Sequence, residues 1–403
     1  MKPRKTAPLA LLLLLALSLQ ILTSCGGSAP PEATDPVQTG PATQPAENTE
    51  KPEEKTDMLP KLDHFYIDRA FDKGEKTNTE MTDEGLSLVA GATEGTYLSE
   101  EIPAANLHSL CGSFSGWTAT DATVELAVSL KVGGTYTKYF SYGEWGFGRR
   151  NRCVGQTDTK AEMDLDEILV TGSALAEGCR VRLTLRRDSA DLDSPTVRLY
   201  SLALELRNYT YAVDASDLPR EVKYDVPEYA QGRVPEIGGS ICSPSTSSML
   251  LAFRGFDVEK DENNAWFPAY SGYTKSTLSY PNGSFAALCN DYGNGIFGNW
   301  SYNVMCMGAY GANACVKRFY SLEEVLESLA EVGPMGVSTR GYIVHSGRSW
   351  NSQGHLMVLT GYRINDDGSR VLYMNDPSFG GVACEITEEN FAKINRMVMY
   401  VIE

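Results

Sequence analysis

Hydrophobic and polar residues alternate repeatedly between residues 62 and 210. The segments 122–132 and 179–187 alternate over much of their length, and a two-residue period is typical of strands that bury one face. Further strand-like segments, separated by Gly-, Asp- and Asn-rich turns, lie at 86–92, 95–102, 138–147 and 196–207. Since no segment here has a helical period, the pattern predicts a first domain that is an all-β sandwich, jelly-roll-like in form.

Residues 211–403 mix helical and strand-like segments, which predicts a second domain of the α+β class. One helix is expected over residues 243–255 and another over residues 321–339. In the second of these, Ser321 and Glu324 have the spacing of a capping box. The chain is therefore expected to fold as two domains of different class, the β-sandwich first.

The N-terminus has the pattern of an export signal. Basic residues at positions 2, 4 and 5 precede an apolar run over residues 7–19, which is short for a membrane span of ~20 residues. The run leads to Leu22-Thr23-Ser24-Cys25, which resembles the lipobox of bacterial lipoproteins. That resemblance implies removal of residues 1–24, a lipid on Cys25, and an extracytoplasmic protein anchored to the bacterial cell membrane. A plain signal peptide followed by a chance cysteine is the alternative.

Residues 25–61 differ in composition from both predicted domains. They are rich in Pro, Thr and Glu, and residues 26–60 contain no aromatic residue. Such a segment buries too little apolar surface to fold, so we expect a disordered tether between the lipid and the domains.

Charge and cysteine spacing argue against two classes of ligand. The chain carries a formal net charge of −17 at pH 7, whereas a nucleic-acid partner requires clustered Lys and Arg. The nine cysteines include no C-x-x-C pair and no Cys/His cluster with zinc spacing, so no metal and no other cofactor is expected. Disulfides are compatible with export, but their pairing cannot be deduced from the sequence.

Cys242 lies between a Gly-Gly-Ser turn and the first predicted helix of the second domain. Ser243 can cap that helix, Pro244 suits its first turn and Gly255 can end it. A thiol at a helix N-terminus is favoured as thiolate by the helix dipole. A lone cysteine is more often a buried apolar residue, so a catalytic role for Cys242 depends on a base elsewhere in the chain.

Among four histidines, His355 has the context of such a base. It begins a predicted strand, and a second predicted strand, 370–375, ends immediately before Asp376. A turn at residues 365–368 would join the two as a hairpin, which brings His355 and Asp376 to the same end. A thiol needs a base, and the imidazole needs a carboxylate or amide to fix its tautomer.

Two other residues compete for these roles. Asn375 is the alternative orienting residue, but neighbours on a strand point to opposite faces, so only one of Asn375 and Asp376 can serve. His345 has no acidic residue following it in its own motif and is expected in a loop or on the surface.

The chain from about residue 226 onwards resembles the C39-like peptidases, which are papain-fold cysteine peptidases, and above all their exported bacterial branch. The matching pieces, in order, are VPEYAQ (226–231), ICSPSTSSMLLAFRG (241–255), GNWSYNVMCMGAYG (298–311), SLEEVLESLAEVGPMGVST (321–339), GHLMVLTGYR (354–363) and VLYMNDPSF (371–379). The resemblance implies Cys242 as nucleophile, His355 as base, Asp376 as orienting residue and Gln231 as oxyanion donor. The chain reads Cys-Ser-Pro at the nucleophile, where many family members read Cys-Gly-Pro.

Aromatic residues suggest two binding surfaces. Trp300 and Tyr302, in a glycine-rich region, and Trp350, shortly before His355, either line a substrate groove or belong to the core. In the first domain, seven aromatic residues lie between positions 117 and 147. They either form a platform for a cell-wall glycan or, as is more common, alternate between the core and the surface of strands.

Together these patterns predict a lipid-anchored extracytoplasmic cysteine peptidase that hydrolyses peptide bonds in a peptide or protein substrate. One alternative is a surface binding protein in which the peptidase fold is catalytically idle and the β-sandwich binds glycan or protein. Another keeps the nucleophile but directs it to amide bonds in the stem peptides of peptidoglycan. Labelling of Cys242 by a thiol reagent at neutral pH separates the idle form from the other two.

Overall fold

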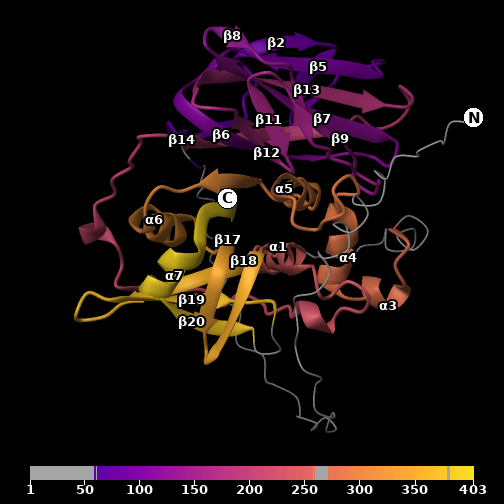
Figure 1. Cartoon of the computed structure of the whole chain (residues 1–403). Coiled ribbons are helices and arrows are strands. Elements are labelled where there is room, and N and C mark those ends of the chain that lie inside the picture. Colours follow the sequence, from indigo (N-terminus) through magenta and orange to yellow (C-terminus); the bar gives the residue numbers. More distant parts are fainter. Residues whose placement is uncertain (1–58, 60, 257, 259–270, 379–381) are drawn as a thin grey trace, which may run out of the picture. The chain divides into compact units, whose positions relative to one another are not determined.

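The structure is a computed structural model (Figure 1) that describes residues 59, 61–256, 258, 271–378 and 382–403. The expected signal segment, Cys25 and nearly all of the expected tether lie outside the described residues. Within the described ranges, no helix has the length and apolar character needed to cross a membrane.

The first domain consists of antiparallel strands, as the alternating pattern predicts. Its strands are β1 (Phe65–Asp68), β2 (Gly74–Thr77), β3 (Thr79–Thr82), β4 (Gly85–Leu88), β5 (Glu94–Ser99), β6 (Ile102–Trp117), β7 (Ala122–Val132), β8 (Thr135–Tyr136), β9 (Phe140–Trp145), β10 (Gln156–Thr157), β11 (Ala161–Asp164), β12 (Glu167–Val170), β13 (Ala176–Arg187) and β14 (Thr196–Leu206). β6 joins two layers, because its first residues pair with β13 and the rest pair with β14 and β12. β13 continues its own layer through β5 and β7.

β6 is a long strand that the alternating pattern did not predict. It contains Pro103, Gly112 and Gly116, and it is buried without interruption from residue 109 to residue 116, so buried and exposed positions do not alternate there. A Cβ at Gly116 would lie 2.1 Å from the carbonyl oxygen of Thr196. The close approach of β6 and β14 therefore requires glycine, which weakens the local strand signal.

The second domain is a seven-stranded antiparallel sheet with helices on both faces. Its elements are η1 (Ala215–Asp217), β15 (Glu221–Lys223), η2 (Gln231–Arg233), α1 (Cys242–Phe253), α3 (Lys275–Leu278), α4 (Pro281–Cys289), α5 (Trp300–Ala309), β16 (Ala314–Arg318), α6 (Leu322–Val332), β17 (Met335–His345), β18 (Arg348–Ile364), β19 (Arg370–Asn375), β20 (Ala383–Thr387), α7 (Glu388–Ile394) and β21 (Asn395–Ile402). Figure 1 shows α6 and α7 on one side of the sheet and α1, α4 and α5 on the other. Alternate residues of β18 face the two helical layers, since Val358 packs with α1 and Met357 with α6.

The predicted hairpin of the second domain is confirmed. β18 and β19 pair from Ile364 opposite Arg370 to Val358 opposite Asn375. The turn between them closes with a hydrogen bond of 3.0 Å from the Gly368 N–H to the Asn365 carbonyl.

The prediction of one helix over residues 321–339 is wrong in its second half. α6 ends at Val332, because Gly333 adopts a φ of 111° and Pro334 follows, and β17 begins at Met335. Ser321 Oγ does cap the helix by accepting from the Glu324 N–H at 3.1 Å. The Glu324 carboxylate instead bonds to the Tyr320 N–H at 2.9 Å and to His64 of the first domain at 2.8 Å.

The two domains share one hydrophobic core, which runs from the sandwich into α1, α4 and α5. Buried hydrogen bonds cross the boundary. Ser115 Oγ of β6 bonds both the carbonyl and the N–H of Ala314, at 2.7 and 2.9 Å. Tyr302 OH of α5 donates to the Tyr142 carbonyl at 2.8 Å. Because the sandwich covers the core of the second domain, the described residues of both domains belong to one compact unit.

Candidate active site

A tight turn delivers the chain to the N-terminus of α1. A Cβ at Gly238 would lie 2.4 Å from the carbonyl oxygen of Gln231 and 2.5 Å from that of Val234. Nothing lies near a Cβ at Gly239. The first glycine of the pair is therefore required by close backbone packing against Gln231, and the turn holds Gln231 and Cys242 in one local unit.

Cys242 is the first residue of α1 and is partly exposed, whereas the helix is buried from Ser243 to Leu251. The expectation that Ser243 caps this helix is wrong. The helix begins earlier, since the Ser245 N–H already donates to the Ile241 carbonyl at 2.9 Å. The Ser243 hydroxyl instead bonds to Tyr400 OH of β21 at 2.8 Å, so this serine ties the start of α1 to the sheet.

The β18–β19 hairpin brings His355 and Asp376 together, as the sequence predicts. His355 Nε2 lies 2.8 Å from Asp376 Oδ1, and both side chains are buried. The Ser378 N–H donates to the same carboxylate oxygen at 2.8 Å, and Ser378 Oγ lies 3.2 Å from His355 Nε2. The His355 imidazole also hydrogen-bonds the Cys242 thiol.

Gln231 lies beside this group. Its side chain is buried, and its N–H donates to the Pro377 carbonyl at 2.8 Å. Its Oε1 accepts no hydrogen bond from any described residue. The carbonyl oxygen of this side-chain amide is therefore not fixed by a donor from the described part of the chain. The structure therefore brings all four sequence-predicted catalytic residues, Gln231, Cys242, His355 and Asp376, into one neighbourhood.

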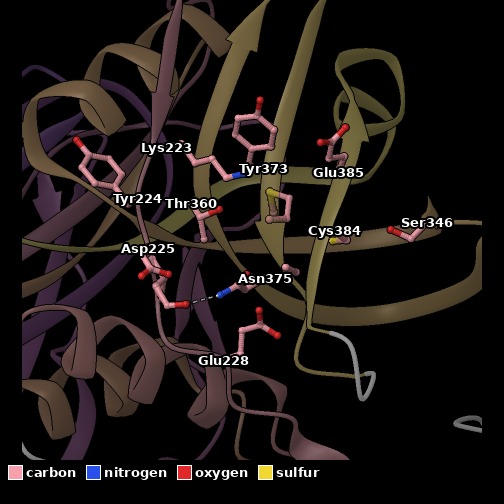
Figure 2. A pocket seen from close by; sticks show the side chains of 13 residues that line it. Lys223, Tyr224, Asp225, Glu228, Ser346, Thr360, Tyr373, Asn375, Cys384 and Glu385 are labelled. Atoms are coloured by element: carbon pink, nitrogen blue, oxygen red, sulfur yellow. Dashed lines mark hydrogen bonds between the residues drawn. The ribbon is translucent and has the colours of Figure 1, made fainter. Parts of the chain in front are cut away.

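Asn375, the alternative orienting residue, points elsewhere. Its Nδ2 donates to the Val226 carbonyl at 3.1 Å (Figure 2). Since neighbouring strand residues face opposite ways, Asp376 is the residue that the strand presents to His355.

Burial and hydrogen bonding shift the pKa values of His355, Cys242 and Asp376. For His355, burial lowers the pKa, but the hydrogen bonds to Asp376 and Cys242 outweigh burial and raise the pKa to about 10. For Cys242, burial raises the pKa, but the hydrogen bond and charge of His355 and the backbone N–H groups nearby outweigh it, so the pKa is lowered. For Asp376, burial raises the pKa, but donors from two histidines hold it well below its usual range. These shifts favour a thiolate–imidazolium pair.

His345 is part of the site, and the expectation of a loop or surface histidine is wrong. Its side chain is buried, and its Nε2 lies 2.8 Å from Asp376 Oδ2. It ends β17 at a hairpin turn in which Ser346 and Gly347 have φ values of 49° and 73°. The Ser-Gly pair between two strand-like segments is a short-hairpin signal that could have placed His345 beside the strand of His355.

The aromatic residues proposed for a substrate groove divide into two groups. Tyr302 is fully buried and Trp300 nearly so, at the boundary between the domains. The groove assignment is therefore wrong for both, and they belong to the core. Trp350 is half-buried, and its ring centroid lies 5.2 Å from that of His345 and 6.1 Å from that of His355, edge-on to each. Trp350 is the one of the three that lies against the two histidines of the candidate site.

The aromatic residues of the sandwich do not form an open platform. Phe140, Tyr142 and Trp145 are buried in the core. The rings of Tyr136 and Tyr139 are covered by the guanidinium groups of Arg180 and Arg182, at 4.7 and 4.5 Å. Most of these residues therefore follow the ordinary alternation between core and surface.

A pocket of about 540 Å³ lies next to the site (Figure 2). Asn375 lines it, but Cys242, His355 and Asp376 do not. Its charged lining residues are Lys223, Asp225, Glu228 and Glu385. The pocket is therefore polar and adjoins the candidate catalytic residues, which do not line it.

The described residues contain eight free cysteines and no group of three or more His, Cys, Asp or Glu residues arranged to hold a metal. Apart from Cys242, these cysteines are buried. Cys242 is thus the one among them that combines partial exposure with a lowered pKa.

Comparisons with known proteins match both domains. Residues 223–399 match the model of the Peptidase_C39 like family, and residues 68–204 match the model of a Peptidase C39 N-terminal domain. No curated protein matches the chain significantly. The two matched segments cover the sheet-and-helix domain that holds Cys242 and the all-β domain packed against it. Residues 223–399 therefore belong to the C39-like peptidases, and the all-β domain before them is similar to an N-terminal domain found in that group.

Proposed function

We propose that this protein is a cysteine peptidase in which Cys242 is the nucleophile, His355 the base, Asp376 the orienting residue and Gln231 an oxyanion donor. The observation that carries the proposal is the continuous chain of hydrogen bonds from the Cys242 thiol through His355 to the buried Asp376. Family membership supports it, although a family fold alone does not establish activity.

The reaction follows from this geometry. The Cys242 thiolate attacks the carbonyl carbon of the substrate, and the carbonyl electron pair moves onto oxygen. N–H groups at the start of α1 and the Gln231 amide stabilise that oxyanion. The His355 imidazolium gives its proton to the leaving amine, and the peptide C–N bond breaks. His355 then takes a proton from water, the hydroxide releases the acyl group, and the thiolate is restored.

A comparison of two cysteine variants tests this proposal. Cys242→Ala is expected to abolish cleavage of a quenched fluorescent peptide library, whereas Cys179→Ala, in the sandwich core, keeps it. Iodoacetamide at pH 7 is expected to label Cys242 in the native protein, and the labelling should weaken in His355→Ala. Equal cleavage by Cys242→Ala and the wild type would overturn the proposal. Labelling of Cys242 without cleavage of any library peptide would leave peptidoglycan stem peptides as the next substrate to assay.

We also propose that the enzyme works outside the cytoplasm, tethered by a lipid on Cys25. This rests on the basic and apolar N-terminal segment and on Leu22-Thr23-Ser24-Cys25. In a bacterial host, the full chain should partition into the detergent phase of a Triton X-114 separation, and Cys25→Ser should move to the aqueous phase. Equal partition of the two proteins would contradict the lipid anchor.

A further inference from the structure

Asp376 is shared by two histidines. His355 Nε2 lies 2.8 Å from Oδ1, and His345 Nε2 lies 2.8 Å from Oδ2. The carboxylate is fully buried, and the side chains of His355 and His345 are 6% and 3% exposed. Each carboxylate oxygen therefore has its own imidazole, although one histidine is sufficient for the catalytic group described above.

The β17–β18 hairpin carries His345 to this position. The pairing of the two strands is irregular between Thr339 and Gly341, where Gly341 adopts a φ of 111°. Beyond this irregularity Ile343 is buried opposite Trp350. Trp350 in turn lies edge-on to both imidazoles. The end of the hairpin is thus packed against the site and does not project freely.

A buried carboxylate with donors on one oxygen alone can rotate about its Cβ–Cγ bond and leaves the other oxygen unsatisfied, which is costly in a low-dielectric site. In this protein, Oδ1 accepts from Ser378 N–H and faces His355, while His345 faces Oδ2. Anchoring from both sides fixes the plane of the carboxylate, and that plane determines where the Nε2–H of His355 must point.

We propose that His345 is a positioning residue for the peptidase reaction, which holds the carboxylate of Asp376 in the plane that orients His355 toward Cys242. This inference rests on the proposed function, but it concerns a residue that acts through Asp376 and does not touch the substrate.

The neighbouring titratable groups are consistent with this role. Cys384 of β20 is close to Asp376, but burial raises its pKa to about 12, so it stays a neutral thiol. Arg348 lies opposite His345 in the hairpin register and is exposed. On β18, α1 and the segment after β19, the titratable groups of the site are His355, Cys242 and Asp376. Glu228 and Glu385 line the adjoining pocket together with Ser346. The charge on the carboxylate is therefore met chiefly by the two imidazoles.

Two substitutions separate positioning from packing. His345→Gln can place an amide N–H near the position of Nε2, whereas His345→Leu is apolar and of similar size. If His345 positions Asp376, we expect kcat/KM to fall about 10–100-fold in His345→Leu, the range typical of residues that orient the metal ligands of an enzyme. KM should change little, and His345→Gln should recover much of the loss. If His345 only fills the core, leucine should be tolerated better than the buried amide, and the order should be reversed.

A second readout does not depend on any substrate. The rate at which iodoacetamide alkylates Cys242, followed by peptide mass spectrometry from pH 4 to pH 11, reports the thiolate–imidazolium pair. In His345→Leu we expect a narrower pH range of fast alkylation than in the wild type and in Tyr342→Phe, an exposed position on the same hairpin. An unchanged profile in a folded His345→Leu protein would refute the inference. If the wild type cleaves no peptide but its alkylation depends on His345, the proposed function fails and the positioning role stands.

The wild-type protein provides a test that no folding defect can obscure. With four histidines in the chain, labelling with ¹⁵N-histidine gives an assignable spectrum. We expect slowly exchanging, downfield Nε2–H signals from both His355 and His345. A fast-exchanging His345 Nε2–H, with a normal shift, would mean that it does not donate to Asp376 and would overturn the proposal.

Discussion

The substitution Asp376→Asn isolates the charge of the orienting residue. It keeps the size of the side chain and a hydrogen-bonding group beside His355, but it removes the carboxylate that faces two imidazoles at 2.8 Å. Because the hydrogen bond to Asp376 is the main cause that raises the pKa of His355 to about 10, the substitution should move this pKa down toward the ordinary histidine value of about 6.5.

The size of the effect depends on pH. At pH 8 an imidazole with a pKa of about 10 is almost fully protonated, whereas one with a pKa of about 6.5 is about 3% protonated. Asp376→Asn should therefore reduce the thiolate–imidazolium form by up to about thirtyfold at pH 8. At pH 6 both forms are mostly protonated, so the loss from this cause should be less than about twofold. The hydrogen bond to Cys242 also raises the pKa of His355, which makes thirtyfold an upper bound.

The assay is kcat/KM for a cleavable peptide between pH 5 and pH 11, in the wild type and in Asp376→Asn. The wild type should lose activity on the alkaline side near pH 10, and the variant should lose it at clearly lower pH. Asp366→Asn, at an exposed carboxylate in the β18–β19 turn, provides the control. A loss in Asp376→Asn that is equal at pH 6 and pH 8 would refute the argument, because it would show that the charge does not set the pKa of His355.

Four further predictions concern the Gly-Gly turn, the titration of Asp376, a buried hydrogen bond and the coupling of the two domains. Gly238→Ala should lower kcat/KM by at least about tenfold or the free energy of unfolding by about 1–3 kcal/mol, because the added Cβ would clash with the Gln231 carbonyl. Gly239→Ala should match the wild type in both assays, because nothing lies within 4 Å of a Cβ at that position. The folded-state pKa of Asp376 is lowered, so its contribution to stability is present above the ordinary carboxylate pKa of about 3.9 and is lost as pH falls toward the folded value. The Tm difference between the wild type and Asp376→Asn should accordingly be largest near neutral pH and shrink below about pH 4, and a constant difference would contradict this. Tyr302→Phe removes the buried hydrogen bond to the Tyr142 carbonyl and should cost about 1–3 kcal/mol in urea unfolding, whereas the exposed Tyr342→Phe should cost less than about 0.5 kcal/mol. Both domains should unfold in one transition in every variant, and separate transitions would show that the shared core does not couple them.

Local sequence patterns predict those features of this protein that depend on short stretches of chain. The alternation in residues 122–132 and 179–187 is enough to identify strands, and the polar turn at residues 365–368 is enough to identify a hairpin. The hairpin then brings His355 to Asp376, since two antiparallel strands joined by a short turn have their outer ends together. The position of Cys242 at the start of a helix is also predictable from a short stretch of chain, because a Gly-Gly-Ser turn precedes it and a run of apolar residues follows it.

Local patterns fail where packing overrides them. Ser243 has the chemistry of a helix cap, but its hydroxyl bonds Tyr400, a residue far along the chain. β6 shows no contrast between buried and exposed positions over residues 109–116, because one face is covered by the sandwich and the other by the second domain. Trp300 and Tyr302 look like groove residues in a glycine-rich segment, but the docking of the sandwich buries them.

The sequence by itself predicted the two domain classes and the grouping of Cys242, His355 and Asp376, because each prediction depends on periodicity, on turn chemistry or on motifs a few residues long. The tertiary structure alone decided that the domains share a core and that Asp376 serves two histidines. His345 and Asp376 meet because the β17–β18 hairpin is irregular near Gly341 and packs its end on the site. Such contacts depend on strand register and on the packing of distant segments, for which no short stretch of sequence carries a signal.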